Sequence, residues 1–208
     1  GELTVLDSSA LDFETNPNIE VTVSAADPFG AATDQVISVQ LSDASEAPEF
    51  TSPGQFEIIE NTSIGTEIYT GVAVDPEGQT VTYSLSDPNN IFAVNTLTGV
   101  ISVNDNSNLD HEMSDSYEIV LSAYDGEQTA NLNINVTITN LNEAPVITSD
   151  TAFSIEENKE NGTATDYTAT AIDPENNSFT WSITSDQHNI FSINASSGVI
   201  SVADNTML

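Results

Sequence analysis

Short acidic motifs recur along this sequence and end several of its apolar stretches. Leu-Asp-x-Glu and Asp-Pro-Glu each occur twice, and further Asp, Asn and Glu residues recur beside them. Calcium takes about six to eight oxygen ligands from carboxylates, amides and the backbone, so clusters of this composition predict calcium sites. The candidate ligands are Asp12, Glu14, Asp43, Glu46, Glu60, Asp75, Glu77, Asp110, Glu112, Asp125, Asn140, Asn142, Glu143, Asp173 and Glu175.

Other metals fit these motifs less well. The sequence holds no Cys, and its two histidines, His111 and His188, share no repeated position. Zinc and copper are held mostly by thiolate and imidazole ligands, which the acidic motifs do not supply. Magnesium keeps several of its waters and is rarely enclosed by protein ligands alone. Calcium is therefore the predicted cofactor.

Paired carboxylates can also perform acid–base chemistry, as they do in glycosidases. Here the pairs are duplicated along the chain, which does not indicate one catalytic pocket. No Ser and His recur together as nucleophile and base, and Lys159 is the single basic residue. The sequence therefore predicts that the chain is not an enzyme.

The charge of the chain restricts its partners. It carries 33 acidic residues and one Lys, for a formal net charge of −32. Nucleic acids and anionic membranes bind basic patches, so neither is expected. Strong acidity is also typical of disorder, but 38% of the residues are hydrophobic and many alternate with polar ones. The pattern favours a folded chain whose charge is balanced by metal cations.

Several sequence features point to an excerpt of a longer exported protein. The absence of Cys excludes a disulfide framework. No apolar run approaches membrane-spanning length. The sequence has no signal peptide and begins partway through a motif that recurs later in the chain, so we expect a fragment of a longer protein.

A unit of about one hundred residues repeats along the chain. The pattern Gly-x-x-x-Val begins at Gly1, Gly99 and Gly198, at spacings of 98 and 99 residues, and Glu-Ala-Pro occurs twice. Only a complete unit is expected to bury a whole core. The predicted domains are 1–46 (the C-terminal strands of one repeat), 47–143 (a complete repeat) and 144–208 (the N-terminal strands of a third).

Each unit has the pattern of short strands. The runs 81–85, 117–123 and 132–138 alternate between apolar and polar residues, as strands with one buried face do. Gly-containing turn signals separate the runs, and no long segment has helical periodicity. The pattern predicts an all-β fold of tandem Greek-key β-sandwich repeats of immunoglobulin-like type, each about 98 residues long.

Together these residues resemble the cadherin superfamily across essentially the whole chain. The resemblance is carried by Leu-Asp-x-Glu, Asp-Pro-Glu, the linker Asp43-Ala-Ser-Glu-Ala-Pro48, and the stretches 81–85 and 92–103. In that family such motifs bind calcium between consecutive repeats. The resemblance implies a first junction of Asp12, Glu14, Asp43, Glu46, Asp75, Glu77 and Asp125, and a second of Glu60, Asp110, Glu112, Asn140, Asn142, Glu143, Asp173 and Glu175.

The linkers depart from the family pattern. Ser45 stands where the linker Asn is usual, and Asn140 replaces the leading Asp of the second linker. Glu77 and Glu175 occupy positions where Asp is usual. We therefore expect fewer or weaker ions than in a full array.

The resemblance implies a structural and adhesive role at the cell surface or in a secreted protein. Calcium would make the inter-repeat junctions rigid, and homophilic adhesion to cadherin-like repeats of other chains would follow. The acidity and the short linkers look most like bacterial surface proteins attached at a membrane.

Two alternatives remain open. The chain could be a carbohydrate-binding module of a secreted polysaccharide-degrading protein, with Tyr69, Tyr124 and Tyr167 as exposed aromatic candidates. Separately, residues 144–208 and 1–46 are roughly complementary parts of one repeat, so copies of the chain could associate head to tail.

Overall fold

The computed structural model describes residues 2–206 and is built from β-strands. The chain divides into two compact units, Gly1–Thr139 and Asn140–Leu208. A single 3₁₀ turn, η1 (Ser8–Ala10), precedes the first strand. Among the described residues, no helix has the length and apolar character needed to cross a bilayer. The all-β prediction is confirmed.

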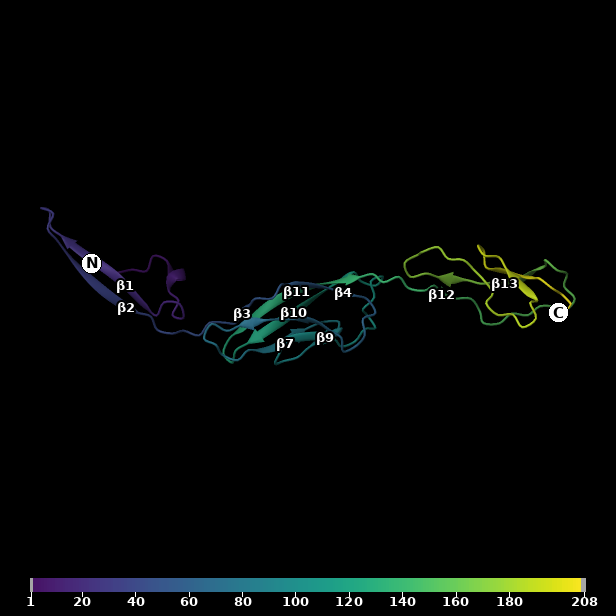
Figure 1. Cartoon of the computed structure of the whole chain (residues 1–208), viewed down its shortest axis with the longest axis horizontal. Helices are drawn as coiled ribbons and strands as arrows, with labels where there is room; N and C mark the ends of the chain where they lie inside the picture. The colour runs from purple at the N-terminus through teal and green to yellow at the C-terminus, as the bar shows by residue number, and fades with distance from the viewer. Residues whose placement is uncertain (1, 207–208) are drawn as a thin grey trace. The chain divides into compact units, whose positions relative to one another are not determined.

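The first unit begins with a two-stranded hairpin, which we call the leading hairpin. Its strands β1 (Asn18–Ala26) and β2 (Ala32–Gln40) pair antiparallel from Asn18↔Gln40 to Ala26↔Ala32. No other strand of the structure is hydrogen-bonded to either of them (Figure 1). Among residues 2–46 none is buried, so this segment holds no core of its own.

The rest of the first unit, residues 47–139, is a β-sandwich that we call the middle repeat. One sheet has the order β4-β11-β10-β7, in which only β4 and β11 run parallel, and the facing sheet has the order β5-β9-β8. A short pair, β3-β6, lies where the chain enters the middle repeat, and we call β3 and β6 the entry strands. The strands are β3 (Glu49–Phe50), β4 (Gln55–Ile59), β5 (Glu67–Thr70), β6 (Ala73–Val74), β7 (Thr82–Ser86), β8 (Phe92–Val94), β9 (Val100–Val103), β10 (Ser116–Tyr124) and β11 (Thr129–Thr139).

The core of the middle repeat follows from the alternation in its sequence. Ile119 and Leu121 of β10 and Ile134 and Val136 of β11 are each at most 1% exposed, while their neighbours in the chain point outward. These side chains pack against apolar residues of the facing sheet, such as Ile101. The predicted buried faces of the runs 117–123 and 132–138 are confirmed.

The C-terminal unit repeats only part of this sandwich. Its strands pair as β12-β14 and as β13-β16-β15, which match β3-β6 and β5-β9-β8 of the middle repeat. Residues 152–156 and 180–184 correspond to β4 and β7 in the repeat but form no strand. The strands are β12 (Val146–Ile147), β13 (Ala164–Thr168), β14 (Ala171–Ile172), β15 (Phe191–Ile193) and β16 (Val199–Val202).

The repeat register lets two equivalent isoleucines be compared. Ile134 of β11 pairs with Ile119, and Ile37 of β2 pairs with Val21, the residue that matches Ile119. Ile134 is 1% exposed, whereas Ile37 is 40% exposed.

We predict that Ile134→Ala lowers the free energy of unfolding of the middle repeat by about 2–5 kcal/mol, because it leaves a cavity in a packed core. The same change at Ile37 is expected to cost less than about 0.5 kcal/mol, since that side chain lies outside this core. Amide hydrogen exchange of β10 and β11 measures both values. Equal losses would contradict the placement of the core.

Candidate calcium sites

The two Asp-Pro-Glu motifs form the same tight turn. In the first, Gly78 N donates to Asp75 O (3.1 Å) and Gln79 N donates to Asp75 Oδ1 (2.8 Å). The turn needs a positive φ at its fourth residue, which Gly78 supplies at +75° without a clash from a Cβ. The backbone thereby fixes one oxygen of Asp75 and leaves the other directed elsewhere.

The C-terminal unit builds the same turn with Asn at the strained position. Asn176 has φ +60°, its N–H donates to Asp173 O, and Asn177 N donates to Asp173 Oδ1 (2.8 Å). Asn tolerates this conformation better than other non-Gly residues. Asp173 is 6% exposed and Asp75 is 4% exposed, so both turns bury the carboxylate of their first residue.

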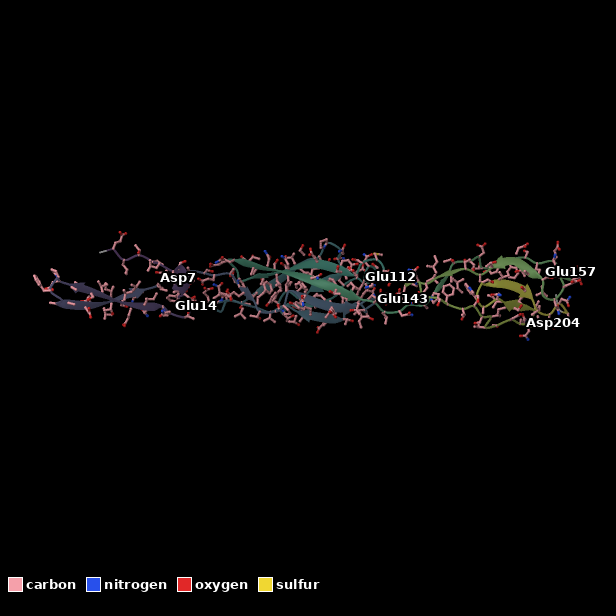
Figure 2. All side chains as sticks on the ribbon, turned by 90° about the horizontal axis from the view of Figure 1, so that it is seen from above. Asp7, Glu14, Glu112, Glu143, Glu157 and Asp204 are labelled. Carbon is pink, nitrogen blue, oxygen red and sulfur yellow. The ribbon has the colours of Figure 1, made fainter. Side chains whose placement is uncertain are left out.

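Three carboxylates of the first unit come together beside the linker. Glu14, Asp43 and Glu77 each place a carboxylate oxygen within 4.8 Å of the other two. Glu14, labelled in Figure 2, lies between η1 and β1. The three ligands thus come from the Leu-Asp-x-Glu segment, from the linker and from the Asp-Pro-Glu turn of the middle repeat.

Three buried carboxylate oxygens near the entry of the middle repeat have no hydrogen-bond donor. They are Asp75 Oδ2, Glu77 Oε2 and Asp125 Oδ2. The other oxygen of each is held in place: Asp125 Oδ1, for example, accepts from the backbone N–H groups of Glu127 (2.5 Å) and Gln128 (2.7 Å). A buried carboxylate oxygen without a partner is costly. A cation bound there would remove that cost, so these residues fit calcium.

The linker residue Ser45 joins this set, which the sequence did not predict. Its hydroxyl oxygen is buried without a hydrogen-bond partner, and its carbonyl accepts a hydrogen bond from Gln128 Nε2. From the sequence alone, Ser45 was interpreted only as a replacement of the usual linker Asn, with the loss of an amide ligand. A hydroxyl oxygen in this position can still serve a hard cation. Burial was the missing signal, and it depends on the tertiary structure.

Asp12 and Glu46 complete the first group. Asp12 Oδ1 accepts from Thr15 N (2.9 Å). Hydrogen bonding to the Thr15 side chain, and then to the Thr15 backbone, lowers the pKa of the Asp12 carboxyl. Asp12, Glu14 and Glu46 line one open pocket together with residues of the entry strands. The structure therefore brings together, around one linker, acids from all three segments of the predicted first junction.

The Glu46 carboxyl is the group most affected by the crowding of negative charge. A hydrogen bond with Glu77 raises the pKa of Glu46 to about 7, and desolvation and the neighbouring acidic groups act in the same direction. A carboxyl with this pKa is about half protonated near neutral pH, so a proton and a bound cation would compete for the same group of acids.

A second group of acids lies at the opposite end of the middle repeat. Glu60, Asp110 and Glu112 place carboxylate oxygens within 4.8 Å of one another. Glu60 is 1% exposed and its Oε2 accepts from His111 N (2.7 Å). Asp110 Oδ1 accepts from Met113 N (3.0 Å), which repeats the Asp12–Thr15 contact of the leading segment.

The acids of the C-terminal unit have a matching arrangement within that unit. Glu143 N donates to Glu175 Oε1 (3.0 Å), as Glu46 N does to Glu77 Oε1 (3.3 Å). Glu175 Oε2 is buried without a donor. Asn142 Oδ1 accepts from Asn177 Nδ2 (3.1 Å), while Asn140 precedes it in the linker. The assignment of these residues to a second shared site stays a prediction.

Comparisons with known proteins identify the family of this chain. Residues 54–139 match the sequence model of the family described as the cadherin domain. Human cadherin-23 is 31% identical over 208 residues, which are 92% of this chain and 6% of that protein. The chain belongs to the cadherin superfamily. Cadherin-related family member 1a of Danio rerio is 32% identical and covers 92% of the chain, which spans 25% of that protein.

Solved cadherin structures share the fold. Mouse cadherin-23 EC22-24 superposes with a TM-score of 0.57 at 26% identity, over 93% of this chain and 66% of that one. Human protocadherin-24 EC1-2 gives a TM-score of 0.56 at 25% identity, over 76% and 78% of the two chains. As a member of the cadherin superfamily, the chain is an extracellular or cell-surface segment and not an enzyme.

The chain is short relative to these proteins. It spans 4% of rat and mouse cadherin-23 and 6% of the human protein. These relatives come from animals, and nothing in the comparisons supports the bacterial origin that the sequence suggested, which stays a prediction.

The structure corrects one prediction from the sequence, namely that the tyrosines suggested as a sugar-binding surface are all exposed. Tyr69 stacks on Phe56 with ring centroids 5.0 Å apart, and Tyr167 stacks on Phe153 at 4.9 Å. Both tyrosines are partly buried within their own units, so neither offers a free face of the kind expected. The prediction assumed strict alternation along each strand, but β5 and β13 both have an irregular register, so strict alternation does not apply to Tyr69 and Tyr167. Of the three, only Tyr124 is exposed (44%).

We predict a titration midpoint near pH 7 for the Glu46 carboxyl in metal-free protein, where an ordinary Glu titrates near 4.5. Since the folded state then holds the proton more tightly, metal-free stability falls as pH rises from about 4.5 through 7. Carbon-13 NMR of the side-chain carboxyls in chelator measures the midpoint. Glu77→Gln should lower it towards 4.5, whereas Glu57→Gln, at an exposed position of β4, should not. An unshifted Glu46 would refute the contact.

Proposed function

We propose that this chain is part of an adhesive extracellular cadherin in which calcium rigidifies the junctions between repeats. The single observation that carries the proposal is the set of three buried carboxylate oxygens without donors, Asp75 Oδ2, Glu77 Oε2 and Asp125 Oδ2. Each belongs to a side chain whose other oxygen is already hydrogen-bonded, so each is oriented before a cation binds.

The composition supports a cation as the partner of these oxygens. The sequence has 33 acidic residues and one Lys. That residue, Lys159, lies 2.8 Å from Glu156 Oε2 in the C-terminal unit. No Arg or Lys exists to neutralise the acids of the first unit. Calcium prefers oxygen ligands and is the cation of this class that protein oxygens alone commonly enclose.

The mechanical effect follows from where the first-junction ligands originate. Asp12 and Glu14 precede the leading hairpin, Asp43 lies in the linker, and Glu77 belongs to the middle repeat. An ion that takes ligands from all three segments ties the linker to both sides of it. Without the ion, the same carboxylates repel and favour a flexible linker. Binding free energy therefore appears as rigidity and as added stability.

The second junction is proposed by repeat equivalence. Glu60, Asp110 and Glu112 would provide the ligands of the preceding repeat. The linker residues Asn140, Asn142 and Glu143 would follow, and Asp173 and Glu175 of the C-terminal unit would complete the set. The expected adhesive partner is the cadherin repeats of another chain.

We predict that millimolar calcium raises the unfolding temperature of the chain by several degrees over chelator, because extracellular calcium modules bind at about 10⁻⁴–10⁻³ M and stabilise by mass action. Magnesium at the same concentration should have little effect. Differential scanning calorimetry measures the shift. Equal midpoints in calcium and in chelator would mean that the acidic clusters are only surface charge.

We further predict that Asp75→Asn weakens calcium binding at the first junction by about tenfold or more, because it removes one charge and one buried ligand oxygen. Glu118→Gln, on an exposed position of β10, removes the same charge outside the clusters and serves as the matched control. Isothermal titration calorimetry measures both. Similar losses for the two variants would indicate a general charge effect instead of a site.

A further inference from the structure

The linker between the leading hairpin and the middle repeat has two halves of different character. Residues 42–44 are exposed, and no described residue forms a hydrogen bond with any of them. From Ser45 onward the chain is shielded: Ser45 and Ala47 are partly buried and Pro48 is buried. The boundary between a free stretch and a docked stretch therefore falls directly before Ser45.

Gln128 binds the first residue of the docked half. It lies in the turn between β10 and β11, and its side-chain Nε2 donates a hydrogen bond to Ser45 O. Its backbone N–H donates to Asp125 Oδ1 (2.7 Å), so the residue that holds the linker also orients a candidate calcium ligand. Gln128 was not among the predicted ligands, because it belongs to none of the repeated acidic motifs.

The next linker residue supplies a second contact on the same peptide unit. Glu46 N donates to Glu77 Oε1 (3.3 Å). Ser45 O and Glu46 N belong to one planar peptide group, so both polar groups of that peptide are bound by the middle repeat. Two contacts from different turns fix the position and the tilt of this peptide, and they thereby orient the buried Ser45 hydroxyl.

The C-terminal unit docks its own linker through a different contact. There Asn142 occupies the position of Ser45, and its Oδ1 accepts from Asn177 Nδ2 (3.1 Å). Asn177 corresponds to Gln79 of the middle repeat, since each donates its backbone N–H to the Asp of its Asp-Pro-Glu turn. Ser45 has no amide with which to repeat this contact, and Gln128 holds its main-chain carbonyl instead.

We infer that Gln128 is a positioning residue, which docks the Ser45–Glu46 peptide on the middle repeat before a cation binds and confines the hinge of the metal-free linker to residues 42–44. The docking needs no ion, because every group in it is a hydrogen-bond donor or acceptor of the chain. The effect on calcium affinity rests on the proposed function, whereas the docking itself does not.

The docking divides the linker ligands into two classes. Ser45 is held in place, whereas Asp43 lies inside the hinge and has to be ordered when an ion binds. Ordering a residue costs conformational entropy, so a short hinge leaves more of the binding free energy as affinity. Without the Gln128 contact, the mobile stretch would extend from residues 42–44 towards the buried Pro48, and the cost of ordering would rise.

The first test measures the metal-free linker by nitrogen-15 backbone relaxation of the whole chain in chelator. We expect amide order parameters of about 0.85 for Ser45 and Glu46, as in rigid backbone, and below about 0.6 for residues 42–44. Gln128→Ala keeps the backbone N–H that Asp125 accepts, and it should lower the order of Ser45 and Glu46 to that of the hinge. Equal order across residues 42–46 in the unmodified chain would overturn the inference.

Two further variants separate the hydrogen bond from the shape of the turn. Gln128→Met keeps the length of the side chain but has no donor, so it should release the linker as Gln128→Ala does. Thr129→Ala, at the adjacent exposed position, is the matched control and should leave the order of the linker unchanged. A linker that stays ordered in Gln128→Met, or that Thr129→Ala releases equally, would contradict the assignment.

The second test measures calcium binding by isothermal titration calorimetry. Loss of one hydrogen bond that positions a ligand should weaken binding about two- to tenfold in Gln128→Ala, with the number of bound ions unchanged. Thr129→Ala should bind calcium as the unmodified chain does. A released linker with unchanged calcium affinity would overturn the positioning role. Absence of calcium binding by the unmodified chain would contradict the proposed function instead, and the relaxation result in chelator would still decide the docking.

Discussion

Negative charges held close together need a positive partner, and this chain has almost none of its own. Glu14, Asp43 and Glu77 have carboxylate oxygens within 4.8 Å of one another, and the sequence contains a single Lys and no Arg. The Glu46 carboxyl forms a hydrogen bond with Glu77, and this contact, followed by desolvation and by the neighbouring acidic groups, raises the pKa of Glu46 to about 7. The proposed role of the chain depends on this constraint, because the element that relieves it must come from the solvent and must contact segments on both sides of the linker.

The fold prepares the acids for this role with backbone hydrogen bonds. Asp75, Asp125 and Asp173 each accept N–H groups at one oxygen from a turn that directly follows them. Fixing one oxygen lowers the conformational entropy that a bound cation would otherwise have to remove. It also explains why the acids recur at strand ends, where the chain turns and unpaired N–H groups are available. The repeated pair of contacts, Glu46 N to Glu77 and Glu143 N to Glu175, shows that the linker and the Asp-Pro-Glu turn are connected in both units.

The sequence predicted the strands of the middle repeat well, for a physical reason. Alternation and local turns are short-range properties, and Tyr83, Leu121 and Val136 are buried as their periodicity indicated. It failed where burial depends on distant residues. Tyr69 and Tyr167 stack inward, and the hydroxyl of Ser45 is buried. Residues 152–156 and 180–184 match β4 and β7 in the repeat but form no strand, so the repeat pattern by itself did not determine the local structure of the C-terminal unit.

The proposal that calcium makes the first junction rigid is tested most directly by measuring how widely the distance across its linker varies. Glu20 of β1 and Glu118 of β10 are exposed, equivalent positions on either side of it. Spin labels on Glu20→Cys/Glu118→Cys, measured by double electron–electron resonance on protein diluted with unlabelled chain, report the distribution of distances across the linker. We predict a broad distribution in chelator that narrows in millimolar calcium and stays broad in magnesium. A distribution of the same width in calcium and in chelator would contradict the claim that calcium makes the junction rigid.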